Sequence, residues 1–139
     1  MKKLLSILLI LCLTASVLGG CAGNLDDPDT LTAIAQEGKT YGEGAVSFTF
    51  VITDEAGKST TVTVKTDKTT VGEALLDTGL VYGENGPYGL YVKEVSGIVA
   101  DYDVNQAWWG FYINGESAVT GVDGENVTPG ATYELRFSK

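Results

Sequence analysis

Apolar side chains alternate with polar ones in two neighbouring stretches, and this period of two constrains the fold more than any other feature. In residues 45–53 and 59–66 apolar residues, among them Phe48, Phe50 and Val64, lie two positions apart along the chain. Alternation of this kind is typical of β-strands that bury one face. The intervening segment DEAGK contains a glycine and indicates a turn, so the two stretches predict a β-hairpin.

The period changes to that of a helix in residues 69–79. Four residues fall on one side of such a helix: Val71, Ala74, Leu75 and Thr78. Thr70 and Glu73 have the spacing of a capping box, and Gly79 stands where helices commonly end in glycine. We therefore expect one short helix that packs its apolar stripe against the sheet.

Further strands follow the helix. Alternating or apolar runs predict strands at residues 90–95, 107–113 and 132–138, whereas residues 80–89 are rich in glycine and indicate a loop. Two strands, a helix and then more strands predict an α+β fold, with a β-grasp-like mixed sheet and one short helix. This domain would occupy residues 45–139, which suits a single small core.

The N-terminus has the pattern of a bacterial lipoprotein signal. Lys2 and Lys3 precede an apolar run, and residues 1–20 end in Leu-Gly-Gly directly before Cys21. This spacing resembles the lipobox, which implies cleavage before Cys21 and lipid on that cysteine, so that the protein is extracytoplasmic and anchored to the cell membrane. Residues 21–44 are predicted to be the lipidated cysteine and a flexible tether. The alternatives are an ordinary signal peptide with a chance cysteine and an uncleaved anchor.

The composition excludes several functional classes. The chain has no histidine, and its two cysteines are Cys12, inside the signal, and Cys21. Imidazole bases, thiol nucleophiles and the usual zinc ligands are therefore missing, and we expect neither an enzyme nor a metal or cofactor site. Acidic residues number 18 against 9 basic ones, two of which lie in the signal, and this excess argues against nucleic-acid binding.

Two loop motifs match known ligand sites only in part. Asp101, Asp103 and Asn105 alternate as in a calcium-binding loop. However, Gln106 replaces the glycine of the sharp turn, and Tyr112 replaces the closing glutamate. The segment GENGPYG lacks the spacing of a phosphate-binding loop. We interpret both motifs as surface turns.

The aromatic segment NQAWWGFYINGESA divides into two faces, because side chains alternate along a strand. Trp109, Phe111 and Ile113 form the larger and more apolar set. We predict that this set lies in the core under the helix.

The second face of the same segment is the candidate binding site. It consists of Trp108, Gly110 and Tyr112, followed by the turn Asn114–Gly115. A sheet with one helix leaves this face uncovered, and a Trp–Tyr pair beside a flat glycine suits a flat or sugar-like ligand. The alternative is that these rings pack against the tether or against residues 80–89.

Four segments together resemble a known family. They are TDKTTVGEALL, GLYVKEVSGI, AWWGFYINGESAVTGVD and VTPGATYELRF. Their order and spacing are similar to those of domain of unknown function 4430, which is related to the C-terminal domain of transcobalamin. The positions that match the family pattern are Trp109, Tyr112, Asn114, Gly115, Glu116, Gly121, Gly130 and Glu134 to Phe137. The resemblance covers nearly all of residues 45–139 and implies a β-grasp-like fold.

The resemblance also implies a function. In transcobalamin and intrinsic factor the related domain closes over one face of cobalamin, and bacterial relatives include surface lipoproteins implicated in corrinoid capture. It implies a lipid-anchored binding protein that captures cobalamin or another corrinoid for uptake, with a membrane importer or a second binding chain as partner. The vitamin carriers add a large helical domain, without which binding should be weaker. The alternative is a cell-surface interaction module for glycan or protein, with no small-molecule ligand.

Overall fold

The computed structural model describes residues 30–139. The predicted signal peptide, residues 1–20, and the predicted lipidation position, Cys21, lie outside the described residues. Within residues 30–139, no helix is long and apolar enough to cross a membrane.

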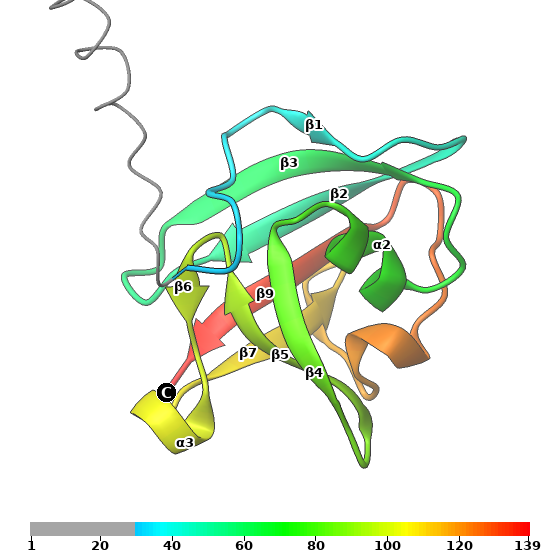
Figure 1. Cartoon of the computed structure of the whole chain (residues 1–139). Coiled ribbons are helices and arrows are strands. Elements are labelled where there is room, and N and C mark those ends of the chain that lie inside the picture. Colours follow the sequence, from blue (N-terminus) through cyan, green and yellow to red (C-terminus); the bar gives the residue numbers. More distant parts are fainter. Residues whose placement is uncertain (1–29) are drawn as a thin grey trace, which may run out of the picture.

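The larger of two β-sheets has six strands in the order β1-β3-β2-β9-β7-β8. They are β1 (Thr40–Tyr41), β2 (Val46–Thr53), β3 (Ser59–Thr66), β7 (Trp108–Ile113), β8 (Glu116–Ser117) and β9 (Thr132–Ser138). β2 and β9 run parallel in the middle, with antiparallel β3 and β7 beside them. A mixed sheet with a short helix on one face confirms the predicted β-grasp-like α+β fold (Figure 1).

Helix α2 and a second sheet cover one face of the larger sheet (Figure 1). The helix is α2 (Val71–Asp77), and the second sheet contains β4 (Val81–Gly86), β5 (Gly89–Val95) and β6 (Ile98–Val99). β4 lies where glycines indicated a loop. The sequence interpretation was wrong here because glycine permits a close strand contact: a Cβ on Gly83 would lie 2.5 Å from the Tyr91 carbonyl oxygen.

Local capping follows the sequence signals. The Thr70 hydroxyl accepts a hydrogen bond from the Glu73 N–H, and Gly79 adopts the positive φ of a helix C-terminus. A second short helix, α3 (Tyr102–Asn105), begins at Asp101, whose carboxylate accepts from the Asp103 N–H. Asp101 thus caps a helix and is only 9% exposed, so the interpretation of this motif as a surface turn was wrong at Asp101. A single 3₁₀ turn, η1 (Val122–Gly124), precedes β9.

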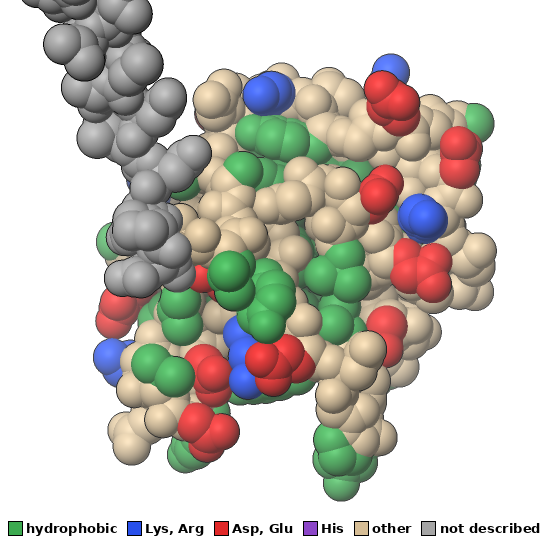
Figure 2. All heavy atoms as spheres, viewed as in Figure 1, with side chains coloured by type: hydrophobic (Ala, Val, Ile, Leu, Met, Phe, Trp, Pro, Cys, Tyr) green, Lys and Arg blue, Asp and Glu red, His purple; other side chains and the backbone are tan. Residues whose placement is uncertain are grey.

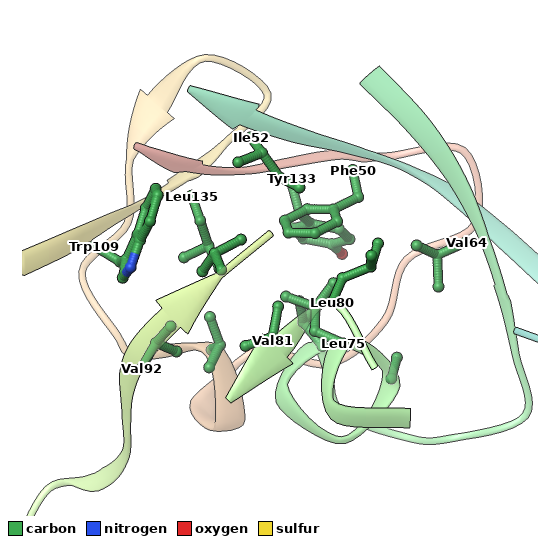
Figure 3. Packing of buried hydrophobic residues seen from close by; sticks show 14 of the residues in the cluster. Phe50, Ile52, Val64, Leu75, Leu80, Val81, Val92, Trp109, Tyr133 and Leu135 are labelled. Atoms are coloured by element: carbon green, nitrogen blue, oxygen red, sulfur yellow. The ribbon is translucent and has the colours of Figure 1, made fainter. Parts of the chain in front are cut away.

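The core fills the space between the two sheets and α2 (Figure 3). Its largest fully buried side chains are Tyr133, Phe48, Phe50, Leu75, Leu80 and Leu135. Trp109 is also buried, while Phe111 and Ile113 are partly buried and pack against this cluster. These positions confirm the prediction that one face of the aromatic segment belongs to the core.

The last part of the predicted tether is fixed to the domain. In residues 31–35, which we call the N-terminal clasp, the Leu31 N–H and the Thr32 hydroxyl both donate to Oε2 of Glu94. Glu94 lies on β5 and is only 3% exposed. Farther along, β1 pairs in parallel with β3. The folded unit therefore starts before residue 45, because backbone and side-chain hydrogen bonds hold this segment.

Candidate functional site

The predicted site residues of β7 lie on the face of the large sheet that points away from α2. Trp108 is 43% exposed, whereas Gly110 and Tyr112 are half-buried. Residues 80–89, which could have covered these rings, instead belong to the opposite side of the sheet, where Tyr88 and Trp109 border the same hollow. The Trp108 ring is thus accessible to a partner.

The Tyr112 ring covers Gly110, so these two residues do not form an open surface for a ligand. A Cβ on Gly110 would lie 3.2 Å from Cε2 of Tyr112, so the phenol ring leans over the glycine. The guanidinium carbon of Arg136 lies 3.9 Å from the centre of the Tyr112 ring, and Glu134 holds Arg136 through a 3.0 Å ion pair. Hydrogen bonding from Arg136 lowers the pKa of Glu134. Of the three predicted site residues on β7, Trp108 is the most exposed.

The Asn114–Gly115 turn serves the sheet. Both residues have positive φ, 49° and 86°, as a tight hairpin turn between β7 and β8 requires. The Asn114 side-chain oxygen accepts from the Thr132 N–H at 2.9 Å, and the Asn114 N–H donates to the Thr132 carbonyl at 2.8 Å. The Asn114 side chain therefore joins the turn to β9.

A hollow of about 260 Å³ opens on the other face of β7, between β5 and η1. Its lining is Tyr88, Leu90, Tyr91, Val92, Trp109, Phe111, Gly121, Val122 and Leu135. Four of the lining residues are aromatic and none is charged. Sequence reasoning missed this hollow, because it assigned the inner face of β7 wholly to the core and residues 80–89 to a loop.

One wall of the hollow is a projecting β-hairpin, residues 83–91, which we call the arm. It extends from the body of the molecule (Figure 1), and hydrophobic side chains gather at its end (Figure 2). Tyr88, in its turn, is 99% exposed although it borders the hollow. The Asp123 carboxylate ties the arm to η1, since it accepts from the Leu90 N–H at 2.9 Å.

Charged groups beside the arm are paired with one another. Lys93 lies 3.0 Å from Glu84 and 3.4 Å from Asp101, and the Tyr82 hydroxyl donates to Glu84. The hydrogen bond from Lys93 lowers the pKa of Glu84, and the bond to Glu84 raises the pKa of Tyr82. These charged groups thus pair with one another, and the residues that line the hollow are uncharged.

A second hollow, of about 280 Å³, lies on the α2 side of the arm. Its lining includes the carboxylates of Glu73 and Asp123, together with Leu90, which borders both hollows. Residues 30–139 contain no group of three or more His, Cys, Asp or Glu side chains that could hold a metal ion.

Comparison with known proteins identifies relatives of this fold. The family model described as Domain of unknown function (DUF4430) matches residues 68–139. A candidate metal-binding protein from Ruminococcus gnavus ATCC 29149 is similar in structure, with a TM-score of 0.64 and 30% sequence identity. That similarity covers 68% of this chain and 98% of the other. Among curated proteins, none matches the sequence.

Haptocorrin, a member of the transcobalamin family, shares the fold through its C-terminal region. Its structure in complex with Cbi is similar with a TM-score of 0.50 and 21% identity. The similarity covers 68% of this chain but only 25% of haptocorrin. The chain thus corresponds to a small part of that protein.

Proposed function

Because the chain belongs to the family described as Domain of unknown function (DUF4430), we propose that it is a binding protein, not an enzyme, which captures a corrinoid for uptake. We further propose that lipid on Cys21 anchors it to the cell membrane outside the cytoplasm. The observation that carries the proposal is the hollow beside β7. Its aromatic, uncharged lining suits a broad, largely apolar ring system with neutral amide groups at its rim.

The size of the hollow indicates how such a ligand is held. Sites that enclose drug-sized ligands have volumes of about 300–1,000 Å³. The hollow of about 260 Å³ lies just below that range, so it accommodates one edge of a corrinoid and leaves the rest uncovered. We therefore expect weak binding by the isolated chain, and tighter binding when a second chain or a membrane importer covers the other side.

Haptocorrin supports the proposal through its fold and through the molecule in its structure. It was solved in complex with Cbi, and its C-terminal region has the fold of this chain.

Calorimetric titration of the purified protein with cyanocobalamin and with cobinamide tests the proposal. We expect heat of binding with a Kd in the micromolar range, and coloured protein after rapid desalting when a tight partner chain is present. Absence of heat at high micromolar protein would refute corrinoid binding by this chain.

Three variants locate the ligand on one face or the other. If the hollow binds it, Tyr88→Ala weakens binding; if the outer face binds it, Trp108→Ala does so. Both side chains are exposed, so neither change disturbs the core. Lys65→Ala, on exposed β3 surface, is the matched control and should leave the affinity unchanged.

The exposed Trp108 ring favours a second candidate function, a cell-surface module that binds glycan or protein. Trp108 lies on the same face of β7 as Tyr112, whose ring contacts Arg136, and within residues 30–139 helix α2 covers the opposite face of the sheet (Figure 1). Exposed aromatic and arginine side chains on a rigid strand are common anchors of interfaces. A glycan array and a pull-down from cell envelope distinguish the candidates: binding that Trp108→Ala abolishes and Tyr88→Ala spares would favour this one.

The anchor has a separate test. Cys21→Ser should release the protein from the membrane fraction, and labelled fatty acid should enter the natural chain but not the variant. Retention of Cys21→Ser in the membrane fraction would show that lipid on Cys21 is not the anchor.

A further inference from the structure

Trp109 contains a polar group without a partner. The ring is 7% exposed, and its Nε1 is closed off from solvent. Within residues 30–139 it is the buried side-chain nitrogen or oxygen that makes no hydrogen bond. Folded proteins pair nearly all buried donors, so an unpaired one requires an explanation.

The position of this group points to the hollow. Trp109 is one of the residues that line it, and the nitrogen edge of the ring turns toward Val92, another lining residue (Figure 3). Phe137 also packs against the ring edge to face, with the ring centres 5.7 Å apart. The donor is therefore held in a defined orientation beside the hollow.

We propose that the Trp109 N–H is the hydrogen-bond donor that recognises an amide oxygen of the bound molecule. The inference rests on the proposed function, because an amide rim is a property of corrinoids. An indole N–H only donates, so its partner must be an acceptor. The lining has no cation to balance an anionic acceptor, and the chain is acidic overall, with a formal charge of −9. A neutral carbonyl oxygen is thus preferred over a carboxylate or phosphate.

Access to the donor requires a small movement of the arm. Nε1 has almost no contact with solvent, so a ligand oxygen reaches it only when a neighbouring side chain moves aside. The arm provides this freedom, since its Tyr88 tip is fully exposed and one hydrogen bond from Leu90 to Asp123 ties it to η1. Entry of one edge of the ligand would displace the arm and, in the same movement, expose the Trp109 N–H.

The decisive experiment replaces the N–H group alone. In the Trp108→Phe protein Trp109 is the remaining tryptophan, and growth with benzothienylalanine substitutes sulfur for its ring nitrogen while keeping the ring size. Cobinamide is titrated into this protein and into Trp108→Phe with ordinary Trp109. We expect about tenfold weaker binding without the donor, and equal or higher Tm of the unliganded protein, since an unpaired donor has been removed. A structural role alone would instead lower the Tm and leave the affinity unchanged.

Nuclear magnetic resonance of the unmodified protein provides a second measurement. The indole N–H signals are followed during addition of cobinamide and, separately, of propionamide, which offers only an amide. We expect the Trp109 signal to move downfield in both, while the Trp108 signal shows whether either probe binds at the outer face instead.

The outcomes separate the two proposals. A Trp109 shift with propionamide but no response to cobinamide would support the donor and overturn the corrinoid function. Cobinamide binding that is equally tight with benzothienylalanine would overturn the donor and leave the function standing. No response of the Trp109 signal to either probe would overturn the donor, and absence of heat with cobinamide would overturn the corrinoid function.

Discussion

The N-terminal clasp gives the sharpest prediction about local stability. Glu94→Leu removes the carboxylate oxygen that accepts from both the Leu31 N–H and the Thr32 hydroxyl. Glu94 is 3% exposed, so leucine also fits the burial of this position. We expect the clasp to detach while the two sheets remain folded, because the segment precedes every strand and can open locally.

The hydrogen bonds set the size of the effect. A bond to a charged group contributes about 1.5–3 kcal/mol, so loss of both amounts to about 3 kcal/mol at the lower end. Since each 1.4 kcal/mol is about tenfold in an equilibrium constant, the open population rises by about 100-fold. The Ala33 N–H donates to the Gly79 carbonyl at 2.9 Å and reports on this opening through its exchange rate.

Hydrogen exchange measures the effect directly. In Glu94→Leu the amide of Ala33 should exchange about 100-fold faster, whereas the buried β2 amide of Phe50 should change little. Glu73→Leu, which removes an exposed acid on α2, is the control. A change of less than threefold at Ala33 in Glu94→Leu would refute the idea that this carboxylate holds the clasp.

Three other changes test the packing of the domain. Tyr133→Phe should lower the free energy of unfolding by about 1 kcal/mol in urea denaturation, because the Thr128 N–H loses its acceptor. Arg136 holds the pKa of Glu134 below 4.5, so Glu134 stabilises the fold above that pH and ceases to do so as the pH falls through its lowered pKa. Glu134→Gln should therefore flatten the acid side of the Tm–pH curve. Gly83→Val should lower the Tm by several degrees, since its Cβ meets backbone.

Each of these has a result that would contradict it. Unchanged urea stability of Tyr133→Phe would mean that water replaces the phenol. An acid-side Tm curve of Glu134→Gln identical to that of the natural protein would remove the Arg136 ion pair as a source of stability. A Tm of Gly83→Val equal to that of the natural protein would show that the arm accommodates the valine side chain at little cost in stability.

The large sheet could be predicted because its information is local. Alternation in residues 45–53 and 59–66, the Thr70 cap and the Asn114–Gly115 turn each determine the structure of their own neighbourhood. β4 could not be predicted in this way, since its glycines have local preferences typical of loops. Its pairing with β5 depends on a close contact at Gly83 that appears only in three dimensions.

The site was predictable only in its composition. Alternation correctly separated Trp108 from Trp109, and exposure agrees with that separation. The sequence did not show that Arg136 would cover Tyr112, or that the inner face of β7 would border a hollow. Both depend on strands distant in the sequence, and on where the second sheet stops covering the first.

The N-terminal clasp also fixes how far the domain can stand from a membrane. With Leu31 and Thr32 bonded to Glu94, the residues after them cannot add to the length of the connection while the clasp is closed. From Cys21 to Thr30 a fully extended chain spans at most about 30 Å. A lipid on Cys21 would hold the domain within about one domain diameter of the bilayer. If the proposed lipid anchor on Cys21 is present, opening the clasp would lengthen the connection, and Glu94 would then control how far the domain can stand from the membrane surface.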